Sequence, residues 1–288
     1  MLIKEYRIPL PFKANSEYMR GQLYTVGQMS LAETGGGEGV EILEQKSFEN
    51  VQLRPGQKHS GVYTRKIYRV KSKAPYLVRK VLPDSVFVLE EQCWNAYPYI
   101  KTVLTNPGYM GKNFSATVES MHLPDCGETE NALNLPSKTL KNREVVFVSL
   151  VDDASVKPNE TRNIYKYRSE KAKRGPMRHS WMKSSSFPKM CAYKVVSVEF
   201  KWFGIQRKME RMMQRSYPKL FIKFHREMFC SLDKWYDMDI DDIRDYEDEV
   251  AEQLRDLLQS GSLRGTIKMV ESPGKKTETE EEPETETT

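Results

Sequence analysis

Two predicted strands carry polar side chains on faces that are otherwise apolar. In residues 62–70, alternation places Thr64 and Lys66 on the more apolar face. In residues 192–202, Lys194 shares a face with alanine, valine and phenylalanine side chains. A lysine on an inward face is costly unless an anion pairs with it. The two lysines therefore indicate either an anionic partner at this face or lysine side chains that extend to solvent.

The last predicted helix shows the same feature. Glu247 lies close to the buried stripe of this helix, four residues after Ile243 and three before Val250. These polar groups can extend to solvent along their alkyl stems or form structural ion pairs. A buried ligand with a phosphate and hydroxyl groups would satisfy them together, with the lysines at the phosphate and with Thr64 and Glu247 at hydroxyls. Both interpretations remain open at this point.

An aromatic pair, Trp202 and Phe203, ends a predicted strand just before Gly204. Basic residues flank the pair, with Lys201 on one side and Arg207 on the other. Large aromatics with basic neighbours suit insertion at a membrane interface. The same residues would also serve as a corner of the hydrophobic core, and the sequence favours neither use.

Catalytic and metal-binding patterns are not found in the sequence. The four histidines lie far apart, and there is no GxSxG, HExxH or Walker motif. The glycine-rich residues 34–39 lack the GK[ST] ending of a phosphate loop. The four cysteines are scattered without a CxxC pair, so we predict neither a zinc site nor a disulfide framework. We therefore predict no catalytic residue, no metal and no cofactor.

The charge of the chain is unevenly distributed. The net charge is +5, but the last sixteen residues hold six glutamates and two lysines. The rest of the chain thus carries about +9. A basic body suits an anionic partner such as a membrane surface or a nucleic acid, or it serves solubility alone. No RNA-binding motif is present, and we predict no nucleic-acid partner.

The composition is that of a globular protein with a wet surface, with 39% hydrophobic and 30% charged residues. The apolar runs are under ten residues, whereas a membrane-spanning helix needs about 20. The chain opens on a strand-like segment, residues 2–9, without the apolar core of a signal peptide. The sequence therefore predicts a cytosolic protein.

The predicted elements fit one α+β domain. Alternating segments predict strands over 2–9, 39–44, 62–70, 101–105, 114–122, 143–151 and 192–201. Loops and turns rather than regular helices separate these strands, which favours an antiparallel sheet. Asn15 or Ser16 is a suitable cap for an early helix.

Helical periodicity dominates the C-terminal third. We predict helices over 205–216 and 220–232, separated near Pro218, and a last helix that begins at Asp239 and fades near residue 260. Residues 157–188 are too long and polar for an ordinary connection, so they form either a functional loop or a disordered segment. The domain is predicted to span 1–265, with an acidic, disordered tail over 266–288.

The chain resembles the phosphatidylinositol transfer proteins, most closely the single-domain class I members, over about residues 1–265. Eight segments carry the resemblance: KEYR at 4–7, GQLY at 21–24, ETGGGEGVE at 33–41, YTRKIY at 63–68, WNAYPY at 94–99, CAYK at 191–194, FKWFG at 200–204 and DDIR at 241–244. The resemblance implies a START-like helix-grip fold, in which a concave antiparallel sheet and two long helices enclose a lipid cavity.

The same resemblance implies a function and a set of site residues. It implies a monomeric, non-enzymatic carrier that binds one phosphatidylinositol or phosphatidylcholine molecule, exchanges it during transient contact with membranes, and supplies phosphoinositide signalling and trafficking. The inositol ring would be held by Thr64, Lys66, Asn95 and Glu247. The phosphate or headgroup would be contacted by Gln22, Thr102, Ser120 and Lys194, where Ser120 replaces a family threonine.

Further residues follow from the resemblance. Trp202 and Phe203 match the aromatic pair that docks the family on membranes, and Ser169 resembles a phosphorylation site. Ile100 replaces a cysteine found in many class I members, which removes a thiol near the lipid, and Lys173 replaces a glycine. A START-like carrier of another lipid, such as phosphatidic acid or a sterol, remains an alternative, as does a lipid hydrolase on the same scaffold.

Overall fold

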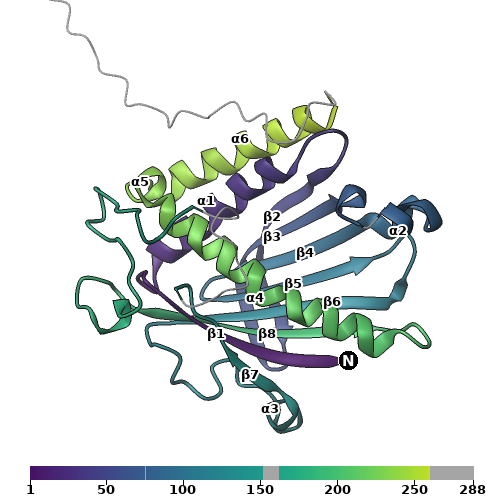
Figure 1. Ribbon diagram of the computed structural model, residues 1–288, viewed down its shortest axis with the longest axis horizontal. Helices are drawn as coiled ribbons and strands as arrows, with labels where there is room; N and C mark the ends of the chain where they lie inside the picture. Colours follow the sequence, from purple (N-terminus) through teal and green to yellow (C-terminus); the bar gives the residue numbers. More distant parts are fainter. Residues whose placement is uncertain (75, 152–161, 260–288) are drawn as a thin grey trace, which may run out of the picture.

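The computed structural model describes residues 1–74, 76–151 and 162–259, and within them an eight-stranded sheet is packed against three long helices (Figure 1). The strands are β1 (Leu2–Leu10), β2 (Gly39–Arg54), β3 (Gln57–Arg69), β4 (Val88–Ala96), β5 (Tyr99–Asn106), β6 (Gly111–Leu123), β7 (Glu144–Phe147) and β8 (Met190–Phe200). The helices are α1 (Ser16–Glu33), α2 (Tyr76–Val81), α3 (Ser137–Asn142), α4 (Gln206–Cys230), α5 (Leu232–Trp235) and α6 (Ile240–Gln259), with short 3-10 turns at Lys71–Lys73, Asp84–Phe87 and Trp181–Lys183.

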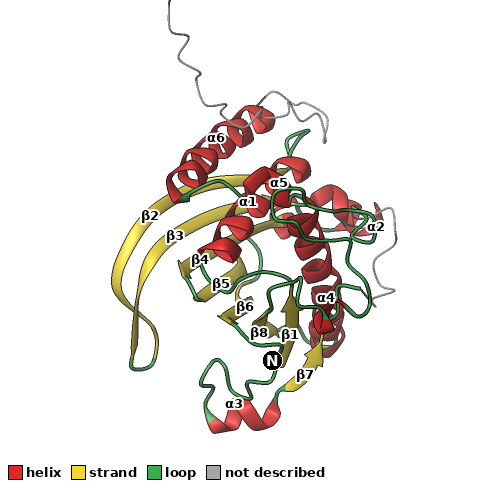
Figure 2. Ribbon diagram, turned by 90° about the vertical axis from the view of Figure 1, so that its left-hand side faces the viewer, coloured by secondary structure: helices red, strands yellow, loops and turns green. Residues whose placement is uncertain are grey.

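The sheet is open and almost entirely antiparallel. Its strand order is β2-β3-β4-β5-β6-β8-β1-β7, and the described pairs are antiparallel except for the parallel pair of β1 with the short edge strand β7. Figure 2 shows β2 and β3 bent into an arc, with α1 on its inner side and α6 beside its upper end. The predicted α+β class and the concave antiparallel sheet gripped by helices are therefore confirmed.

Helix α1 lies close to its neighbours because two of its positions have no side chain. A Cβ atom on Gly21 would come within 2.6 Å of Met228 in α4 and 2.7 Å of Trp235 in α5. A Cβ atom on Gly27 would come within 2.8 Å of Tyr246 in α6. Asn15 caps α1 through a hydrogen bond that its side-chain oxygen accepts from the backbone of Glu17, as the sequence predicted.

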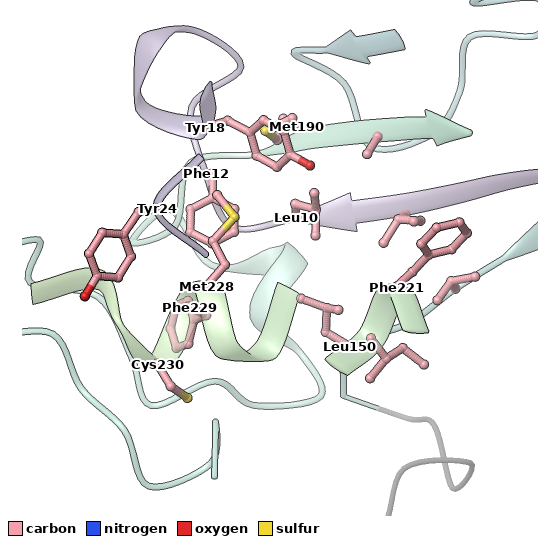
Figure 3. Close-up of a cluster of buried hydrophobic side chains, with 14 of the residues drawn as sticks. Leu10, Phe12, Tyr18, Tyr24, Leu150, Met190, Phe221, Met228, Phe229 and Cys230 are labelled. Carbon is pink, nitrogen blue, oxygen red and sulfur yellow. The ribbon is translucent and has the colours of Figure 1, made fainter. Parts of the chain in front are cut away.

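The main core lies between β1, β8 and the C-terminal half of α4. Figure 3 shows Phe12 between Tyr18 on one side and Met228 and Phe229 on the other. The ring of Phe12 lies 6.1 Å from that of Tyr18 and 6.4 Å from that of Phe229, with tilted planes that suit aromatic packing. This core fills the concave face at β1 and β8. A pocket remains at the other end of the sheet, between β2, β3, α1 and α6.

The predicted break at Pro218 is wrong, because α4 runs through this residue. Proline has no N–H, so the carbonyl of Gln214 loses its usual helical partner. The hydroxyl of Tyr6 in β1 donates to that carbonyl at 2.7 Å. The side chain of Gln214 also donates to the carbonyl of Val196 in β8 at 2.9 Å. The helix therefore continues because the sheet supplies the missing hydrogen bond.

The β2–β3 region also differs from the prediction. The sequence predicted a loop between two short strands, but the strands continue into a long hairpin that turns at Pro55 and Gly56. Gly56 has a φ of +73°, which a type II turn with proline before glycine requires. Strand β4 was not predicted, since Glu90, Glu91 and Gln92 interrupt its apolar alternation.

The long polar segment is ordered where the structure describes it. Within residues 162–188, Ile164, Met177 and Trp181 are buried in the main core, so this part packs against the domain. The predicted strand over 143–151 is shorter and forms β7. The predicted domain boundary at residue 265 and the acidic tail lie outside the described residues.

Candidate functional site

Six of the eight predicted headgroup residues lie on one face of the sheet, in three neighbouring rows. Residues directly opposite each other on paired strands point to the same face. Read across the strands, the rows are Lys66 with Glu91, Thr64 with Cys93 and Thr102, and Asn95 with Ile100, Ser120 and Lys194. Helix α6 covers the end of these rows on β3, so the face is the concave, inner one.

Helix α6 completes a polar pocket at this end of the sheet. Asp239 caps the helix by accepting hydrogen bonds from the backbones of Asp241 and Asp242, which fixes the register of the turns that follow. Glu247 then lines the same pocket as Thr64 and Lys66, with apolar side chains of α1 around them. The sequence-based grouping of these three residues is therefore reproduced in space.

The charges in this pocket are incompletely paired. Lys66 is only 9% exposed and makes neither a hydrogen bond nor an ion pair with any residue that the structure describes. Burial raises the pKa of Glu247, although Arg244, which donates a hydrogen bond to it, and the more distant Lys66 oppose this. A mostly buried lysine without a protein partner favours a ligand that brings acceptor oxygens to its ammonium, so this pocket is suited to such a ligand.

Lys194 approaches the same space from the middle of the sheet. Its Nζ donates to Oγ of Ser120 at 3.2 Å. Burial lowers its pKa from 10.5 to about 8. Burial raises the pKa of the Cys93 thiol to about 11, and the charges of Lys66 and Lys194 both act against this rise. Both ammonium groups therefore reach the space around Cys93, between the two halves of the predicted site.

Eight side chains in the described part of the chain keep a buried polar atom without a hydrogen-bond partner. Two belong to predicted site residues, namely Oδ1 of Asn95 and Oε1 of Gln22. Others are the side-chain oxygens of Thr25 and Tyr97 and Nε2 of His122. Nδ1 of His122 lies 2.9 Å from the carbonyl of Pro98 and must donate to it, so Nε2 is an acceptor. Because each such buried atom costs about 1–3 kcal/mol when unpaired, these atoms suit a polar ligand.

An apolar pocket adjoins the polar one. The two share Val26 and Ser30 of α1 in their walls. The apolar pocket is lined mainly by side chains of α1, β3 and α4, among them Met29, Leu220 and Phe224. A polar pocket that opens beside an apolar one matches a ligand with a charged head and a hydrocarbon part.

Cys93 is the site residue that the sequence did not identify. It faces the same side as Thr64 and Asn95, and its neighbour across β5, Thr102, donates to its sulfur at 3.5 Å. Alternation backward from Asn95 would have found it if β4 had been recognised as a strand. Ile100, which replaces the cysteine of many class I members, is buried in the next row. Cys93 therefore still provides a thiol on this face. The raised pKa keeps that thiol protonated and poorly nucleophilic.

The aromatic pair lies at the turn between β8 and α4. Phe203 is fully exposed, and Trp202 is 40% exposed. The ring of Trp202 is stacked on that of Phe200 at 6.4 Å and lies 5.9 Å from that of Tyr109. The core-corner interpretation is therefore excluded for Phe203, while Trp202 is supported by other aromatic side chains.

Ser169 is buried beneath its loop. Its hydroxyl donates to the carboxylate of Asp233 in α5 and accepts from the backbone of Ala172. Phosphorylation at this position stays a prediction, and it would require the loop to open. No group of three or more metal-ligating side chains occurs among residues 1–74, 76–151 and 162–259. In the same ranges, no helix is long and apolar enough to cross a membrane.

Comparisons with known proteins agree with this arrangement. A family model described as phosphatidylinositol transfer protein matches residues 1–252. Phosphatidylinositol transfer protein beta isoform from Homo sapiens is 42% identical over 277 residues, which cover 92% of this chain and 98% of the relative. Phosphatidylinositol transfer protein 1 from Dictyostelium discoideum is 43% identical over 262 residues, which cover 90% of this chain and 96% of the relative. The similarity thus extends over nearly the whole length of these relatives.

Proposed function

The chain belongs to the phosphatidylinositol transfer protein family, and we propose that it carries one phosphatidylinositol or phosphatidylcholine molecule between membranes without altering it chemically. The observation that carries this proposal is the mostly buried side chain of Lys66, which lies beside Thr64 and Glu247 and has no partner among the described residues. Inositol hydroxyls would accept from Lys66 and Thr64 and donate to Glu247 and Asn95. The phosphate would lie toward Lys194, Ser120, Thr102 and Gln22.

The apolar part of the lipid provides the physical need for a carrier. Moving two acyl chains with about 30 methylene groups into water costs roughly 20 kcal/mol. The apolar pocket beside the headgroup pocket, with a volume of about 270 Å³, would take up part of these chains. A sterol would leave Lys66, Lys194 and Glu247 without partners, so the proposal favours a phospholipid over that rival.

Headgroup selection follows from the same unpaired groups. Phosphatidic acid would supply a phosphate to Lys194 but no ring hydroxyls to Thr64, Lys66 and Glu247. Phosphatidylcholine would leave these groups equally unpaired, so it should bind without depending on them. Discrimination between headgroups arises because a wrong ligand leaves buried polar groups without a hydrogen bond.

Membrane contact is the second part of the proposal. A protein that spends time in the cytoplasm must open its pocket only at a bilayer, since apolar surface otherwise meets water. Phe203 protrudes fully, and Trp202 lies half exposed beside it. These aromatics would enter the interface and dock the carrier, as a monomer, during exchange.

Transfer of labelled phosphatidylinositol and phosphatidylcholine between vesicles tests this proposal. The double variant W202A/F203A should slow the transfer of both lipids about tenfold or more, because each large side chain contributes about 1.5–3 kcal/mol when buried. The amount of lipid held per protein should stay unchanged. F147A, which removes an exposed ring on the edge strand β7, is the matched control and should transfer at the normal rate. Normal transfer by the double variant would refute the docking role.

A further inference from the structure

A third pocket lies outside the concave face, in the loops that precede β8. Its polar lining consists of three cationic side chains and three serines, namely Arg168, Lys173, Arg178, Ser180, Ser184 and Ser186. No aspartate or glutamate lines it among the described residues. The volume is about 340 Å³, within the range of small-molecule sites.

Two of the three cations of this pocket have no partner in the described part of the chain. Arg168 and Arg178 make no side-chain hydrogen bond or ion pair within the described part of the chain. Lys173 lies 3.4 Å from Glu170, but both side chains are more than two-thirds exposed, and such a surface pair contributes little. Guanidinium groups with hydroxyl donors around them match the oxygens of a phosphate group.

The backbone at Lys173 gives an independent reason to assign a ligand here. Its φ is +55°, in the left-handed region that is unfavourable for residues with a Cβ atom and open to glycine. A glycine would occupy this position without strain. A lysine held here at a cost in stability is explained when its ammonium has a use in the pocket.

The loops that form the pocket are held firmly to the domain. Arg174 makes a buried two-point ion pair with Glu17 of α1. Asp233 of α5 accepts hydrogen bonds from Ser169 and from the backbones of the two residues after it. The loop that carries Arg168 and Lys173 is therefore anchored to the domain, while the cationic side chains of the pocket are exposed to solution.

The location of the pocket separates it from the proposed bilayer contact. Trp202 and Phe203 precede the first turn of α4, whereas the pocket loops contact α5, which follows its last turn (Figure 1). Helix α4 has 25 residues and spans about 37 Å at roughly 1.5 Å per residue. When the aromatic pair is in a bilayer, the pocket is at the distant end and open to solution.

We propose that this pocket binds the phosphate group of a soluble phosphorylated ligand, with Arg168, Lys173 and Arg178 as the cations that hold it. The phosphate site itself uses none of the residues of the concave face, but its assignment to a ligand from solution rests on the docking role proposed for Trp202 and Phe203. Phosphate esters in solution and phosphorylated lipid headgroups share this chemistry, and the position of the pocket assigns the former.

Calorimetric titration of the full chain with inorganic phosphate and pyrophosphate, at low ionic strength, tests the proposal. R168Q and R178Q should each weaken binding about tenfold, because each removes a charged hydrogen bond. K173G should weaken binding to a similar extent while its melting temperature stays equal or rises, since the strained backbone is relieved. A purely structural role for Lys173 would not separate binding from stability in this way.

Two further variants locate the anion. R207Q removes an exposed arginine at the opposite end of α4 and should bind phosphate as the native protein does. K194M removes the lysine at which the lipid phosphate is placed, so it reports any anion that binds at the concave face. No phosphate binding above that of chloride, or binding lost in K194M rather than in the pocket variants, would overturn the proposal. Binding of the native protein to phosphatidylcholine vesicles that contain phosphatidic acid, if it is lost in R168Q/R178Q, would overturn the assignment to a ligand from solution.

Discussion

Buried charges occur in two regions of this protein, and the regions differ in how those charges are paired. Near the start of α1, Arg174 and Glu17 are 5% and 6% exposed and form a two-point ion pair. Under the concave face, Lys66 is nearly as buried but has no partner among the described residues. A buried charge that is fully paired holds the fold together, whereas one that is unpaired reserves its hydrogen bonds for a ligand.

The same contrast holds for other buried groups. In β1, Arg7 donates to Glu5 at 2.7 Å and to the carbonyl of Gly127 at 2.9 Å. On the concave face, Asn95 and Gln22 keep buried oxygens without donors from the described residues. Burial alone therefore does not identify the site; on the concave face it is combined with missing hydrogen-bond partners. Three predictions follow the contrast between the two regions.

The largest effect is expected where the charge is paired. E17A leaves the guanidinium of Arg174 buried and uncompensated, so the free energy of unfolding should fall by about 3–5 kcal/mol. Denaturant unfolding with and without bound lipid would measure it, and the loss should be similar in both. E49A, at an exposed position, should change stability by less than about 0.5 kcal/mol. A loss as small in E17A as in this control would contradict the structural role.

A medium effect is expected from the titration of Lys194. Its pKa of about 8 lies below that of a free lysine, so the lipid-free native state binds fewer protons than the unfolded state above this pH. Stability of the lipid-free protein should therefore rise with pH between about 8 and 10.5. A bound phosphate favours the charged lysine, so affinity for an anionic phospholipid should fall above pH 8, by at most about tenfold per pH unit.

Equilibrium exchange of labelled lipid at pH values on either side of 8 would measure this dependence. K194M removes the titrating group and should bind the anionic lipid with little change over the same range. An equally steep pH dependence in K194M would assign the effect to another group, since the lysine would then be absent.

The smallest effect is expected for stability at Lys66. K66M removes a buried charge without a partner and keeps most of the side-chain volume, so the lipid-free protein should be equally stable or slightly more stable. Denaturant unfolding of lipid-free samples would measure it. A loss comparable to that of E17A would show that Lys66 has a structural role, and the contrast between the two regions would fail.

Local patterns in the sequence predicted much of the site. Alternation placed Thr64 and Lys66 on one inner face, and the apolar stripe of the last helix placed Glu247 toward the core. The sequence could not bring Ser120 and Lys194 together, since their contact depends on the pairing of β6 with β8 across a long insertion. The family resemblance predicted both residues as site residues. Only the strand register, which pairs Ser120 with Lys194, explains the hydrogen bond between them.

Other structural features could not be predicted, either because they depend on residues distant in the sequence or because the local sequence lacks a recognisable pattern. Pro218 predicts a helix break until Tyr6, from the other end of the chain, supplies the hydrogen bond that the proline removes. Three polar residues in succession, Glu90, Glu91 and Gln92, concealed β4 and with it Cys93. The strained Lys173 could be noticed in the sequence as a departure from the family, but its backbone angle could not be read there.

The central claim is that unpaired polar groups of the concave face select the headgroup. Native mass spectrometry of the purified protein, followed by extraction of its lipid, tests this most directly when T64D and K66A are compared with the native chain. One phospholipid should be bound per chain, and both variants should lose phosphatidylinositol while retaining phosphatidylcholine. An empty native protein, or a bound lipid whose identity ignores both substitutions, would contradict the account.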